Sequence, residues 1–121
     1  MIKDLDVIKD SNLVRWTNEG QDYQFHLNCL DASMVDESRQ LIFILSDCVS
    51  FPRKLDILND VGKVIYSSLP PTGSTFYYLK KTESHEVVVV CSFEEKVDNW
   101  YDWHCSFDVE CRELHRIAPA Y

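Results

Sequence analysis

Residues 86–93, with the sequence EVVVVCSF, constrain the fold of this chain more than any other stretch. Four consecutive valines lead to Cys91, and β-branched residues of this kind favour strands. Because no polar residue interrupts the run, the pattern predicts a strand that is buried on both faces and central in its sheet. Residues 41–45 form a second apolar run of this kind. Within the first run, Cys91 is expected to fill space in the core.

Turn-forming residues divide much of the remaining chain into short segments that resemble strands. Residues 18–21 and 59–62 each contain a glycine between two apolar segments, which predicts two hairpins. The charged residues 80–85 are expected to turn the chain into the valine strand. A turn near residues 109–111 would let the end of the chain pair back on residues 100–108. These features together predict a largely antiparallel arrangement.

Two segments leave their conformation open. Residues 1–10 carry an apolar side chain at every third position, which fits either a short amphipathic helix or an irregular strand. Residues 31–39 are polar, and we expect either a single helical turn or a plain loop there.

The length of 121 residues and a hydrophobic content of 45% predict a single domain over residues 1–121. We expect a mainly β fold, with α+β as the alternative class. Its strands would form a twisted antiparallel sheet that is curled into a barrel or split into a sandwich. One or two short helices would accompany the strands.

The chain lacks the sequence signals of export or membrane insertion. Its longest strictly apolar runs have five residues, whereas a membrane span needs about 20. Asp4 and Asp6 interrupt any secretory signal, so we expect a soluble cytoplasmic protein without membrane partners. Five cysteines are an odd number for a disulfide framework, and free buried thiols in a reducing compartment are the expectation.

The formal net charge of −8 is unevenly distributed. Residues 94–113 carry seven acidic side chains against two basic ones, and residues 1–40 carry eight against four. A nucleic-acid binder needs a basic footprint, so a nucleic-acid partner is not expected. The charge serves either solubility alone or attraction to a basic protein partner.

Catalytic and metal-binding patterns have little support in the sequence. Common nucleotide-binding, zinc-protease and hydrolase motifs are absent. His104, Cys105, Cys111 and His115 resemble metal ligands in composition, but neighbours in a strand point to opposite faces. We therefore expect neither an enzyme, a metal site nor a cofactor.

Aromatic and acidic residues near the carboxyl terminus suggest a binding surface. Trp100, Tyr101 and Trp103 lie within four positions, and alternation along a strand sends Trp100 away from the other two rings. Such rings are either absorbed by the core or exposed as interface anchors beside acids that attract a partner. In the second case the candidate partner-binding residues are Glu94, Glu95, Asp98, Trp100, Asp102, His104, Asp108, Glu110 and Glu113.

In its acidity, small size, many strands and lack of catalytic motifs, the chain resembles the immunity proteins of bacterial contact-dependent growth inhibition and polymorphic toxin systems. The resemblance lies in overall character, and these families share no common motif from which residues could be carried over. It implies a protein that binds a cognate toxin, often a basic nuclease, and blocks its active site or substrate groove. The acidic side chains would then stand where substrate phosphates would lie.

Two other functions fit the same composition. A β-barrel that binds a small apolar ligand would use the many rings to line an interior cavity. A subunit that pairs through an exposed strand edge would form oligomers at increasing concentration.

Overall fold

The computed structural model of this protein describes residues 1–120. Its strands pair with their neighbours in antiparallel fashion throughout, so the predicted mainly β class is confirmed. The helical part of these residues is one 3-10 turn, η1 (Lys9–Ser11). The strands are β1 (Ile2–Ile8), β2 (Leu13–Asn18), β3 (Gln21–His26), β4 (Ala32–Asp36), β5 (Leu41–Ser46), β6 (Lys54–Leu58), β7 (Val64–Ser68), β8 (Ser74–Lys81), β9 (Val87–Val97), β10 (Trp100–Asp108) and β11 (Glu113–Pro119).

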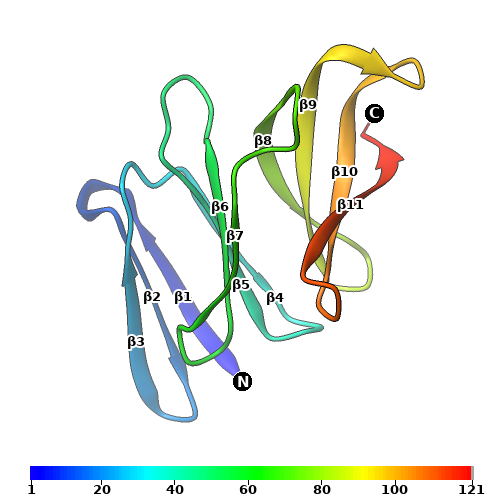
Figure 1. Cartoon of the computed structure of the whole chain (residues 1–121). Helices are drawn as coiled ribbons and strands as arrows, with labels where there is room; N and C mark the ends of the chain where they lie inside the picture. Colours follow the sequence, from blue (N-terminus) through cyan, green and yellow to red (C-terminus); the bar gives the residue numbers. More distant parts are fainter. Residues whose placement is uncertain (121) are drawn as a thin grey trace.

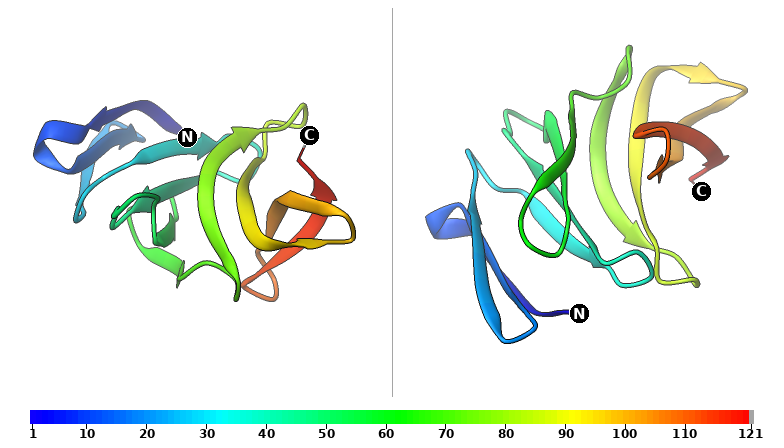
Figure 2. Two further views of the ribbon diagram at one scale, coloured as in Figure 1. Left: turned by 90° about the horizontal axis from the view of Figure 1, so that it is seen from above. Right: turned by 60° about the horizontal axis from the view of Figure 1, so that its bottom comes forward.

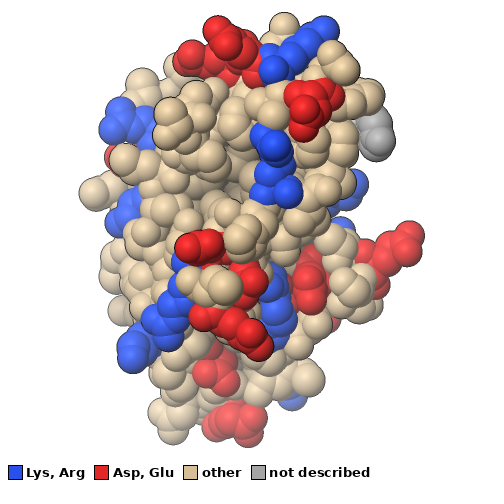
Figure 3. Space-filling view, turned by 45° about the vertical axis from the view of Figure 1, so that its right-hand side comes forward, with Lys and Arg blue, Asp and Glu red and all other residues tan. Residues whose placement is uncertain are grey.

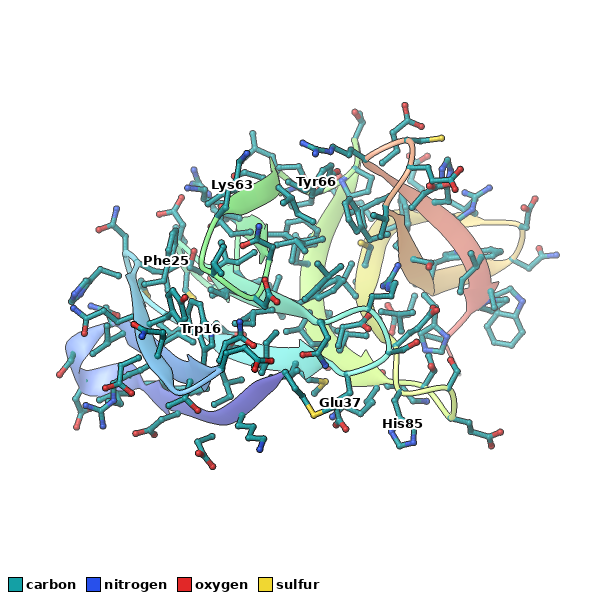
Figure 4. All side chains as sticks on the ribbon, turned by 90° about the horizontal axis from the view of Figure 1, so that it is seen from below. Trp16, Phe25, Glu37, Lys63, Tyr66 and His85 are labelled. Carbon is teal, nitrogen blue, oxygen red and sulfur yellow. The ribbon has the colours of Figure 1, made fainter. Side chains whose placement is uncertain are left out.

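The strands form three sheets that are stacked as layers. Sheet A has the order β1-β2-β3, sheet B the order β4-β5-β6-β7, and sheet C the order β8-β9-β10-β11. Figures 1 and 2 show sheet B between the other two. Two apolar cores result, one on each face of sheet B. Trp16 belongs to the core towards sheet A and Tyr66 packs against the core towards sheet C, and Figure 4 shows both side chains.

The middle position of sheet B explains the unbroken apolar run of β5. Leu41, Phe43 and Leu45 belong to the core shared with sheet C. Ile42 and Ile44 belong to the core shared with sheet A. Every residue of β5 is consequently buried, as the absence of alternation predicts.

The valine strand is also confirmed as an interior strand of its sheet, with β8 and β10 on its two sides. Val87, Val89 and Cys91 face sheet B. Val88 and Val90 point to the outer face of sheet C and are nevertheless buried. Their cover comes from cross-strand neighbours, since Lys80 lies opposite Val88 and both Tyr78 and His104 lie opposite Val90.

The prediction of a helical turn or loop over residues 31–39 is wrong, because Ala32–Asp36 forms strand β4. This strand pairs with β5 along its whole length, from Ala32 opposite Leu45 to Asp36 opposite Leu41. The polar residues that made this segment resemble a loop in the sequence form hydrogen bonds. The Ser33 hydroxyl donates to the Phe43 carbonyl, and the Asp36 carboxylate accepts hydrogen bonds from Arg39.

The amino-terminal segment adopts the irregular strand of the two predicted alternatives. The register between β1 and β2 shifts between Lys3 and Asp6, and Asp4 has a φ of 56° within that bulge. The predicted hairpins β2–β3, β6–β7 and β8–β9 are all present.

Of the two predicted architectures, the layered sandwich is the one observed. The three sheets over residues 1–120 are stacked and do not close into a barrel. These residues therefore do not form the β-barrel that the sequence offered as an alternative, with a small apolar ligand in its interior. Within the same range, no helix has the length and apolar character needed to cross a bilayer.

Candidate functional site

The β9–β10 hairpin presents most of the residues that the sequence singles out. Its loop consists of Asp98 and Asn99, with φ values of 48° and 73°. Positive φ at both positions of a two-residue loop is the type I′ geometry, which matches the twist of antiparallel strands and suits Asp and Asn. Val97 and Trp100 pair directly across this loop. Figure 1 shows the hairpin at the end of sheet C that lies away from the amino terminus.

Two of the three neighbouring rings are exposed. Trp100 and Tyr101 are 41% and 50% exposed, whereas Trp103 is 8% exposed. The Trp103 indole Nε1 donates to the carbonyl oxygens of Val97 and Trp100 at 3.3 and 3.2 Å, and the Arg116 guanidinium covers its ring at 4.6 Å. Trp103 is thus a structural residue of the hairpin.

The exposure of Tyr101 differs from the simple alternation that groups it with Trp103. The register between β9 and β10 shifts between Trp100 and Asp102, so that Trp100 lies opposite Val97 and Asp102 lies opposite Ser92. A bulge of this kind changes the direction of the side chains next to it. Tyr101 falls within the shift and turns to the surface.

Four acidic residues lie on the same hairpin as these two rings. Glu94, Glu95 and Asp98 are exposed and Asp102 is half-buried. We call these four acids together with Trp100 and Tyr101 the hairpin cluster. Basic groups offset part of its charge, because the Lys96 ammonium lies 5.5 Å from the Tyr101 ring centre and Arg116 Nη2 lies 3.8 Å from Asp98 Oδ2.

The remaining acids lie at the other end of β10. Asp108, Glu110 and Glu113 flank the β10–β11 turn, and we call them the turn cluster. Asp102 and Asp108 are six residues apart on β10, which corresponds to roughly 20 Å along a strand. The structure therefore does not bring all the candidate acids into one patch. Figure 3 agrees, because acidic side chains form several groups with basic side chains between them.

Within the turn cluster, Asp108 has a clear structural role. Its Oδ1 accepts hydrogen bonds from the backbone N–H groups of Cys111 and Glu110, at 3.1 and 2.9 Å. These bonds, that from Cys111 first, lower the pKa of the Asp108 carboxyl below its usual value. His115 Nε2 lies 3.9 Å from Asp108 Oδ2 and 3.8 Å from Glu113 Oε2.

His104 lies between the two clusters on the outer face of sheet C. It is half-buried, opposite Val90 on one side and Ala118 on the other. Burial, followed by the nearby charge of Lys80, lowers the pKa of the imidazole. His104 therefore acts as a packing residue whose neutral ring covers the buried Val90. It belongs to neither cluster, unlike the other candidate residues.

Sequence reasoning missed a second group of exposed rings. Phe51 and Tyr77 pack edge to face with centroids 5.8 Å apart, and Tyr77 contacts Tyr78 at 5.0 Å. A register shift between Phe76 and Tyr78 turns Tyr77 outward. The available signal was the run of three rings at residues 76–78, which one strand face cannot bury in full.

Within residues 1–120, no three His, Cys, Asp or Glu side chains converge on a possible metal position. His104 and Cys105 point to opposite faces, as predicted, since they pair with Val90 and Val89. A surface depression of about 650 Å³ lies on sheet A and is open to solvent, with the charged residues Asp6 and Arg15 in its wall.

Comparison of the chain with protein-family models, with curated protein sequences and with solved structures found no match.

Proposed function

We propose that this protein is a non-enzymatic, acidic binding protein that neutralises a basic protein partner, in the manner of an immunity protein that blocks a cognate toxin domain such as a nuclease. The observation that carries the proposal is the hairpin cluster. Trp100 and Tyr101 are both more than 40% exposed at the end of a hairpin that also carries Glu94, Glu95 and Asp98. This proposal includes a cytoplasmic location and excludes nucleic acid as the partner.

Two physical effects would favour binding at the hairpin cluster. Large rings bury much apolar area at a small entropic cost, which is why Trp and Tyr are common anchors in interfaces. Carboxylates on the same hairpin attract a basic surface over a distance of about one Debye length and raise the association rate. The hairpin cluster offers both within a single element.

The turn cluster has a different role in this proposal. It lies roughly 20 Å from the hairpin along β10, and Asp108 is engaged in the turn. Glu110 and Glu113 would contribute to the overall field of a chain with a net charge of −8 rather than to direct contact.

The test measures association of the protein with a basic toxin domain from the same genomic neighbourhood at low and at high salt. The variant Glu94→Gln/Glu95→Gln/Asp98→Asn removes three exposed charges from the hairpin. The control Asp10→Asn/Asp22→Asn/Glu83→Gln removes three exposed charges elsewhere. We expect the hairpin variant to lower the association rate at low salt about tenfold or more, and the control to lower it much less. Equal effects of both variants, or rates that do not depend on salt, would contradict the proposal.

A further inference from the structure

Two cysteines from different loops lie side by side at the junction of sheets A and B. Cys29 is in the β3–β4 connection and Cys48 is in the β5–β6 loop. The Cys48 thiol donates to the Cys29 carbonyl, with 3.1 Å between sulfur and oxygen.

Backbone hydrogen bonds join the two chain segments next to this contact. The Asp47 N–H donates to the Asn28 carbonyl at 2.8 Å, and the Asp31 N–H donates to the Leu45 carbonyl at 2.9 Å. The two cysteines are therefore neighbours because of the fold and not because of a chance orientation of their side chains.

The pair is also accessible to reagents. Cys29 is exposed and Cys48 is partly buried, in contrast to the fully buried Cys91 and Cys105. Burial, then the interaction with the Cys29 thiol, and then the charges of Asp31 and Asp47 raise the pKa of Cys48 to about 11. The thiol of Cys48 thus stays protonated at neutral pH, and Cys29 is the group that meets an oxidant first.

We propose that Cys29 and Cys48 form a redox-sensitive pair, which a small-molecule disulfide such as glutathione disulfide converts into an intramolecular disulfide bond. The Cys29 thiolate attacks one sulfur of the oxidant, whose S–S bond breaks and releases one glutathione thiolate. Cys48 gives up its proton, attacks the Cys29 sulfur and expels the second glutathione. The two protein thiols are oxidised, the oxidant is reduced to two glutathione molecules, and the two released protons end on their sulfurs.

The second neighbouring pair of cysteines provides an internal contrast. Cys91 lies opposite Trp103, and Cys105 lies opposite Val89, so these two cysteines are diagonal neighbours on β9 and β10. Their thiols interact with each other, as those of Cys29 and Cys48 do. Both are, however, closed off from an oxidant by the core. This pair should remain reduced under conditions that oxidise Cys29 and Cys48.

The new disulfide bond would link the β3–β4 connection, which passes from sheet A to sheet B, to the β5–β6 loop of sheet B. It closes a loop of about 20 residues, for which the entropy of the unfolded chain predicts a melting temperature about 10 °C higher than that of the reduced protein. This consequence is independent of the proposed partner.

The experiment treats the folded protein in a Cys111→Ser background with glutathione disulfide at neutral pH, followed by peptide mapping under non-reducing conditions and a thermal melt. We expect a peptide linked through Cys29 and Cys48, a higher melting temperature, and intact thiols at Cys91 and Cys105. In Cys48→Ser, a glutathione adduct should accumulate on Cys29, and in Cys29→Ser, Cys48 should stay unmodified. An adduct on Cys29 of the parent protein without an internal bond, or a linkage through Cys91 or Cys105, would overturn the proposal.

Discussion

Arg39 and the fully buried Asp36 form an ion pair that joins sheet B to sheet C. Arg39 donates through Nε and Nη2 to Oδ2 of the Asp36 carboxylate, at 3.0 and 2.7 Å. The same Oδ2 accepts the backbone N–H of Val87 in β9 at 2.9 Å, and Arg39 Nη1 donates to the Phe107 carbonyl in β10. Two residues of the β4–β5 region thus satisfy backbone groups of the neighbouring sheet.

Replacement of Arg39 by Met should destabilise the protein by about 3–5 kcal/mol, because it leaves the fully buried Asp36 carboxylate without its counter-charge. Urea unfolding measures the effect. The matched control is Arg15→Met, which removes an exposed pair with Asp6 and should cost less than about 1 kcal/mol. Similar losses for both variants would show that the pair does not hold the sheets together.

Trp100→Ala should weaken binding of the basic partner about 30-fold or more, the range of an interface anchor, mainly through faster dissociation. Tyr77→Ala serves as control, because Tyr77 is similarly exposed but belongs to the other group of rings. Trp103→Ala should instead lower stability by about 3–5 kcal/mol, since its indole is buried and hydrogen-bonded. An unchanged dissociation rate for Trp100→Ala would argue against the hairpin cluster as the contact surface.

Asp108 should make the stability of the β10–β11 turn dependent on acid pH. The folded protein lowers the pKa of this carboxyl, so its contribution is fully present above the ordinary value of 3.8 and is lost as the pH falls through the lower, folded value. Thermal melts of the parent and of Asp108→Ala should therefore differ most near neutral pH and converge in strong acid. Asp108→Asn keeps an acceptor oxygen without the charge, so part of the stability should remain without this dependence on pH. A constant difference between the parent and Asp108→Ala over the whole range would rule out the ionised carboxylate as the cause.

Asn99→Gly should stabilise the hairpin by a few tenths to about 1 kcal/mol. Asn99 has a φ of 73°, and glycine adopts this region without the steric cost that a Cβ atom brings. Asn99→Val should destabilise the protein by about 1–2 kcal/mol for the same reason. Urea unfolding of the two variants gives the sign of each effect, and a loss of stability in Asn99→Gly would mean that the Asn99 side chain itself is needed.

The candidate site was only partly predictable. Strand alternation correctly sends Trp100 away from Trp103, and the exposure of the two residues differs accordingly. Alternation fails at Tyr101, because a bulge depends on the register between two strands and has no signature in either strand alone. The separation of Asp102 from Asp108 follows from their spacing of six residues along one strand, and this spacing can be read from the sequence.

The sequence by itself determined which segments are strands with two buried faces, since residues 41–45 and 87–91 have no polar alternation and must be covered on both sides. It also determined the hairpins, because a turn depends on a few adjacent residues. Only the tertiary structure decided that β5 lies between two other sheets, that the polar segment Ala32–Asp36 pairs with it, and that Cys29 meets Cys48. The physical reason is that a pattern of side chains specifies which faces are buried, whereas the partner that buries them is chosen by the packing of the whole chain.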